Sequence, residues 1–74
     1  MTVEFVLTTE HKATGETETD VVLRSTPGIP HVGENVIYKR ASFEVEIVDH
    51  LIDDASGRRA SVVCYRVDDT GAGE

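Results

Sequence analysis

The densest set of side chains that could do chemistry in this 74-residue chain begins at Asp49. Asp49 directly precedes His50, and a carboxylate beside an imidazole could act as a general acid or base if a cleft held them together. In a strand, however, neighbouring side chains point to opposite faces of the sheet, so the two cannot act as a pair without a bulge. The following Asp53 to Gly57 is rich in turn-forming residues. The segment therefore predicts a strand end and a turn, and no catalytic residue.

Four side chains could in principle bind a metal: His11, His31, His50 and Cys64. No pair has the spacing of a known metal motif, and the histidines fall in separate segments. Cys64 lies between Val63 and Tyr65 in the most apolar stretch, which is typical of a small buried hydrophobe and not of a nucleophile. The sequence therefore predicts no metal site and no cofactor.

The basic residues form two pairs, Lys39-Arg40 and Arg58-Arg59, each at a predicted hairpin tip. The tips terminate opposite ends of one strand and so lie roughly 30 Å apart if that strand is straight. They should not form one phosphate-binding track, and aromatic residues interleaved with cations are missing. We expect Arg58 and Arg59 to balance Asp53 and Asp54 locally. Nucleic-acid binding is accordingly the second choice.

Fourteen acidic residues against seven basic ones give a net charge of −7, which repels nucleic acids and anionic membranes on average. One interpretation is simply an acidic surface that maintains solubility. The other rests on the acid excess, the scarcity of lysine, the eight threonines and the absence of tryptophan. This composition resembles that of proteins from halophilic archaea, and the resemblance implies poor folding at low salt, where acidic side chains repel without screening.

The cellular location of the protein is predicted from its cysteine content, its first residues and the length of its apolar runs. A single cysteine excludes an intramolecular disulfide and favours a reducing compartment. The first residues lack the basic and apolar regions of a signal peptide, and no apolar run approaches the roughly 20 residues that span a bilayer. We expect a cytoplasmic protein with no membrane contact.

Strands must position all of these residues, because no window shows a sustained helical period. Val3, Phe5 and Leu7 alternate with polar residues, although Val6 breaks the alternation. Val21 to Leu23 is expected to be the buried part of the second strand. Phe43, Val45 and Ile47 should share one face, and the apolar phase slips after Ile47, which predicts a bend or bulge. Five strands are expected: Thr2–Glu10, Glu16–Arg24, Asn35–Lys39, Phe43–Ile52 and Ala60–Val67.

These strands predict an all-β fold, a five-stranded antiparallel meander rolled into a partly open barrel. The last strand is apolar on both parities, so it should be central or covered on both faces. Residues 1–68 should form one domain and residues 69–74 a flexible, disordered tail. Pro30-His31-Val32-Gly33-Glu34, the strand after it and the hairpin into Phe43 resemble small SH3-like β-barrels. That resemblance implies a barrel and no catalytic residues, and the family's peptide-binding aromatic residues are not evident here.

The favoured function is a non-enzymatic protein-interaction or structural module, since no phosphate-binding loop or nucleophile elbow is present. A partner protein could add a strand to an exposed edge, with Thr2–Glu10 and Asn35–Lys39 as candidate edges. The protein should be a monomer or a weak homodimer through such an edge. The long Ser25–Gly33 connection is either functional or a plain crossover in which Ile29 plugs one end of the barrel. The candidate interaction residues around it are Ile29, Val32 and Tyr38.

The alternative function is an accessory nucleic-acid-binding module that works at high salt. Its candidate residues are the two basic pairs, Lys39, Arg40, Arg58 and Arg59.

Overall fold

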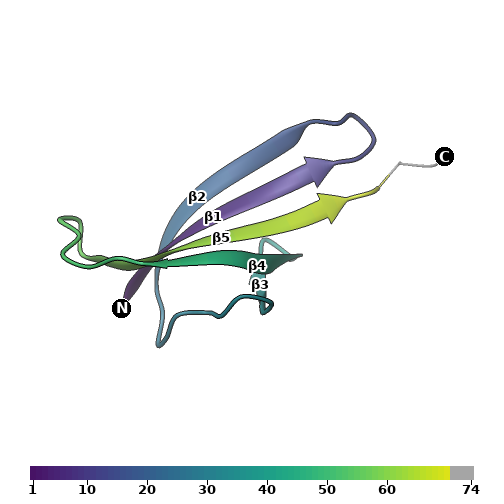
Figure 1. Cartoon of the computed structure of the whole chain (residues 1–74). Coiled ribbons are helices and arrows are strands. Elements are labelled where there is room, and N and C mark those ends of the chain that lie inside the picture. The colour runs from purple at the N-terminus through teal and green to yellow at the C-terminus, as the bar shows by residue number, and fades with distance from the viewer. Residues whose placement is uncertain (71–74) are drawn as a thin grey trace.

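The computed structural model describes residues 1–70, and these contain five strands and no helix. The strands form one sheet in the order β2-β1-β5-β4-β3, which curls into a half-barrel (Figure 1). The predicted strands therefore exist, and each lies within a few residues of its expected place. Their bounds are Thr2–His11 for β1, Thr17–Ser25 for β2, Asn35–Tyr38 for β3, Ala41–His50 for β4 and Arg58–Asp68 for β5.

The sheet is mixed, because β1 and β5 run parallel while the other neighbouring pairs are antiparallel. The predicted antiparallel meander is therefore wrong at the centre of the sheet. Hydrophobic alternation identifies a strand but does not say which distant strand will lie beside it. One consequence is that β1 is a central strand, so the predicted edge at Thr2–Glu10 is also wrong. The free edges belong to β2 and β3, and the predicted edge at Asn35–Lys39 is confirmed.

The core lies on the concave side of the sheet, where alternate residues of the three inner strands meet. β5 runs through the middle of the sheet, as its apolar sequence predicted, but only one of its two faces is fully buried. Thr9 is the buried polar residue beside this core. The buried apolar residues are Val3, Phe5, Leu7, Phe43, Val45, Ala60, Val62 and Cys64.

Two local irregularities shape β4. Its pairing with β5 shifts register between Val45 and Ile47, so β4 has the predicted irregularity, but before Ile47 and not after it. Ile47 therefore lies on the face opposite the core and not, as expected, beside Phe43 and Val45. At its start, a two-residue turn links β3 to β4. Lys39 and Arg40 both have positive φ, 48° and 66°, as a type I′ hairpin turn requires.

The connection from Ser25 to Gly33 carries the chain from one edge of the sheet to the other, from β2 to β3. The Thr26 N–H donates to the Met1 carbonyl at 2.8 Å, and the Gly33 N–H donates to the Val45 carbonyl at 2.8 Å. Ile29 is half-buried and packs against the core. These contacts favour the crossover interpretation of the segment.

Two further predictions meet the structure differently. Val21 and Leu23, expected to be buried, are 59% and 52% exposed, and only Val22 of that strand packs against the core. They are exposed because their side chains project from the outer face, which no other element in residues 1–70 covers. The predicted tail, residues 69–74, falls largely on residues 71–74, which lie outside the described residues.

Candidate functional site

The Asp49–His50 pair does not form a catalytic site. Asp49 lies opposite Ser61 and His50 lies opposite Ala60, so the two side chains project from different faces of the sheet. Both are exposed. The geometry is the one expected of neighbouring residues in a strand.

Asp54, in the turn between β4 and β5, is the centre of an ion-pair group. The Arg58 N–H, Nε–H and Nη2 each donate to its carboxylate at 3.1 Å, and the Ser56 hydroxyl donates to it as well. The Arg58 side chain holds the pKa of Asp54 well below its usual range, helped by the Ser56 hydroxyl. Arg58 also donates to Glu4 on β1.

This ion-pair group confirms that Arg58 balances Asp54, whereas no ion pair of Arg59 occurs within residues 1–70. A shallow pocket of about 270 Å³ adjoins the turn. Both carboxylate oxygens of Asp54 already accept hydrogen bonds, so they hold the turn together and are not available for acid–base chemistry.

The candidate metal ligands are likewise dispersed. Cys64 is fully buried, and burial raises the pKa of its thiol to about 11, so it is protonated at neutral pH, as expected of a core hydrophobe. His11 ends β1 and is half-buried. Its Nε2 lies 3.3 Å from Glu18 and its Nδ1 lies 3.3 Å from Asp68, on opposite sides of the ring. Within residues 1–70 no group of three such side chains could hold a metal ion.

The half-barrel is open between its two free edges, and we call this opening the mouth. It contains an apolar groove of about 220 Å³ with contributions from β1, β2 and β3. Residues on its floor, such as Phe5 and Leu7, belong to the core. The residues that line it are Phe5, Leu7, Val22, Arg24, Thr26, Val36, Ile37 and Tyr38.

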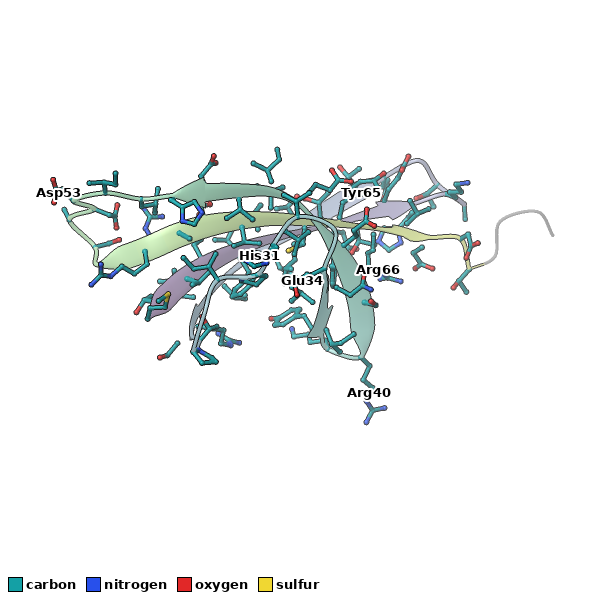
Figure 2. The ribbon with its side chains drawn as sticks, turned by 60° about the horizontal axis from the view of Figure 1, so that its bottom comes forward. His31, Glu34, Arg40, Asp53, Tyr65 and Arg66 are labelled. Atoms are coloured by element: carbon teal, nitrogen blue, oxygen red, sulfur yellow. The ribbon has the colours of Figure 1, made fainter. Side chains whose placement is uncertain are left out.

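Two cations border the mouth. Arg24 lines the groove from β2, and the Lys39 ammonium lies 5.4 Å from the centroid of the Tyr38 ring on the β3 side. Neither makes an ion pair within residues 1–70. Arg40 is also a cation of this hairpin, but Figure 2 shows it at the tip, pointing away from the sheet. The mouth is thus an apolar groove between positive charges.

The outer face of the sheet carries an uninterrupted line of aliphatic side chains across four strands. Val21 on β2 pairs with Val6 on β1, Val6 with Val63 on β5, and Val63 with Ile47 on β4. We call these residues the aliphatic row. Val21 and Ile47 are 59% and 51% exposed, and the two central valines are half-buried. No element of residues 1–70 covers the row.

Acidic groups flank the aliphatic row on both sides. On one side Glu4 is held by Arg58, and the Ser61 hydroxyl donates to it at 3.2 Å. On the other side the Tyr65 hydroxyl donates to Glu10, and this hydrogen bond raises the pKa of Tyr65. Figure 2 shows Tyr65 and its neighbour Arg66 on opposite sides of the sheet.

The three predicted interaction residues do not form one surface. Ile29 packs against the core, Val32 is 64% exposed in the crossover, and Tyr38 lines the mouth. The four predicted basic residues also divide, since the Lys39-Arg40 turn and Arg58 lie at opposite ends of β4. Sequence reasoning missed the aliphatic row, although Val6, which broke the alternation of its strand, was a signal for it. It also missed Arg24.

Comparison of the chain with protein-family models, with curated proteins and with solved structures gives no match. Residues 1–70 include no helix that is long and apolar enough to cross a membrane. The sheet itself presents two apolar surfaces, the mouth and the aliphatic row.

Proposed function

We infer that the chain is a non-enzymatic protein-interaction or structural module. The observation that carries this inference is the aliphatic row, which crosses four strands on a face that nothing in residues 1–70 covers. Single exposed apolar residues are normal on soluble proteins, but contiguous ones mark interaction surfaces. Burying them against a partner gains roughly 25 cal/mol per Å² of apolar area removed from water.

A protein suits the row better than a nucleic acid. The groups on its two sides, Glu4 and Glu10, are acidic, and the chain as a whole carries a charge of −7. The alternative nucleic-acid function needs Arg58, whose guanidinium is already paired with Asp54 and Glu4. No specific observation favours that alternative.

Finer properties belong to the same proposal. The half-barrel is an open form of the small SH3-like barrel, which the segment from Pro30 to Gly33 and the two-residue β3–β4 hairpin support. The protein acts in the cytoplasm, for which the single, buried Cys64 is the support.

The experiment replaces the two exposed end residues of the row in one double variant, Val21→Thr and Ile47→Thr. The double variant and the wild type are then immobilised in parallel affinity captures. Threonine keeps the β-branched shape that suits a strand while removing apolar surface. Proteins captured from the source cells by the wild type and lost with the variant are then purified and titrated by calorimetry. We expect the double substitution to weaken such binding about tenfold or more.

Val32→Thr is the matched control, because Val32 is equally apolar and exposed but lies in the crossover, away from the row. It should leave capture and affinity unchanged. The proposal fails if every captured protein binds the row variant as tightly as it binds the wild type.

A further inference from the structure

Cations are scarce in this chain, and their placement relative to the mouth is uneven. Of the seven lysines and arginines, Arg58 and Arg66 contact carboxylates. Two of those without an ion pair in residues 1–70, Arg24 and Lys39, border one apolar groove. Asp20 precedes Val22 on the same face of β2 but does not line the groove. In a protein with a net charge of −7, the mouth is a local site of positive charge.

Backbone groups at the mouth are also available for pairing. β3 pairs only with β4, so its other edge is free. Tyr38 and Ala41 bracket the two-residue turn and therefore form a hydrogen-bonded pair. The alternation of antiparallel pairing then directs the N–H and C=O of Ile37 away from β4, toward the free edge. An incoming strand would find both a donor and an acceptor there.

The size of the groove suits side chains better than a small molecule. Its volume of about 220 Å³ is below the roughly 300–1,000 Å³ of pockets that enclose drug-sized ligands. It is lined from both edge strands, β2 and β3. A strand added to β3 would direct every second side chain into it.

We propose that the mouth binds an extended segment of a partner protein in which aliphatic residues alternate with aspartate or glutamate. The segment adds to the free edge of β3 and its aliphatic side chains occupy the groove, while the carboxylates that alternate with them project at the rim of the mouth, within the positive field of Arg24 and Lys39. Charge complementarity selects this occupant, because a basic segment would meet two unpaired cations. This site is on the face opposite the aliphatic row, so it stands or falls separately from the function proposed above.

The test uses a synthetic peptide with the sequence of residues 42–47, Ser-Phe-Glu-Val-Glu-Ile, in which apolar residues alternate with glutamate. Its matched partner carries lysine at the two acidic positions. Fluorescence anisotropy at physiological ionic strength should show the acidic peptide binding about tenfold more tightly than the basic one. Methylating alternate backbone nitrogens of the acidic peptide should abolish binding, since strand addition needs those N–H groups.

Variants then locate the site. Arg24→Gln with Lys39→Gln should bring the affinities of the two peptides to within about twofold of each other, from the tenfold difference. Arg59→Gln is the control, because Arg59 also lacks an ion pair in residues 1–70 but lies at the start of β5, beside the end of β4 that is farther from the mouth hairpin. The row variant, Val21→Thr with Ile47→Thr, should bind the acidic peptide as the wild type does.

Three outcomes overturn the proposal. The first is equal affinity for the acidic and basic peptides in the wild type. The second is that the row variant loses peptide binding while the Arg24–Lys39 variant keeps it, which would assign the peptide to the outer face. The third is a dimer in sedimentation that the acidic peptide cannot dissociate, because a second copy would then occupy the edge. The first and third results do not bear on whether the aliphatic row binds a partner, whereas the second would assign the peptide to the row.

Discussion

The mouth and the aliphatic row both expose apolar side chains, but they do so among opposite charges. The mouth lies between Arg24 and Lys39, whereas the row lies between the groups around Glu4 and Glu10. The mouth also offers a free strand edge, while the row is built on paired strands and offers side chains alone. If each surface binds a partner as proposed, the two partners would be distinguished by charge and by backbone pairing, even though both surfaces are aliphatic.

The largest expected effect separates the two faces of the sheet by burial. Val62 is 0% exposed in the core, so Val62→Thr leaves a buried hydroxyl without a partner and should lower the free energy of unfolding by about 1–3 kcal/mol. The same replacement at Val21, in the row, should change it by no more than about 0.5 kcal/mol. Urea unfolding followed by circular dichroism measures both.

An equal loss in the free energy of unfolding for Val62→Thr and Val21→Thr would contradict the assignment of inner and outer faces. A large cost at Val21 would mean that something covers the row, in which case the row is not a free surface.

Val62 and Val21 also show which features of the fold could be predicted from the sequence and which could not. Alternation at Val3, Phe5 and Leu7, and the phase slip after Ile47, predicted strands and a bulge, because both are local consequences of which face is buried. Val21 was wrongly expected to be buried, since its exposure depends on what packs over the outer face. Strand order depends on contacts between distant segments, above all the parallel pairing of β1 with β5. The mouth could not be predicted without that order.

The next effect concerns the hairpin that carries the cations of the mouth. Arg40 has a φ of 66°, where a non-glycine residue costs about 1–2 kcal/mol, and glycine returns part of this as entropy of the unfolded chain. Arg40→Gly should therefore stabilise the protein by about 0.5–1 kcal/mol in urea unfolding. It should leave peptide binding unchanged, because Arg40 points away from the sheet (Figure 2).

Arg59→Gly is the matched control, since Arg59 lies in β5, where glycine destabilises a strand. If Arg40→Gly weakened peptide binding as much as the Arg24–Lys39 variant does, the positive charge of the mouth would extend to the hairpin tip.

A third experiment tests the acidic group beside the row. The pKa of Asp54 is lowered in the folded state, so its carboxylate stabilises the fold at every pH above its ordinary value of about 4. That contribution is lost as the pH falls through the lowered value. Asp54→Asn should lower the melting temperature at neutral pH, and the difference from the wild type should shrink as the solution is acidified.

Asp53→Asn serves as the control, because asparagine tolerates the positive φ of 58° at that position and Asp53 makes no ion pair within residues 1–70. A difference between wild type and Asp54→Asn that stayed constant down to acid pH would show that the turn, and not the charge on Asp54, is what the substitution disturbs.

The smallest effect is expected from salt, and its sign should differ between folding and binding. Raising ionic strength from about 0.01 M to about 0.15 M shortens the Debye length from about 30 Å to about 8 Å. Screening should relieve repulsion among the fourteen acidic side chains and raise the melting temperature. The same screening should weaken binding of the acidic peptide to Arg24 and Lys39 by a few-fold at most, since apolar contacts in the groove persist.

If the chain is fully folded without added salt and its melting temperature does not rise when salt is added, the acidic surface is not a salt adaptation. If peptide binding strengthens with salt, apolar burial and not charge selects the occupant of the mouth.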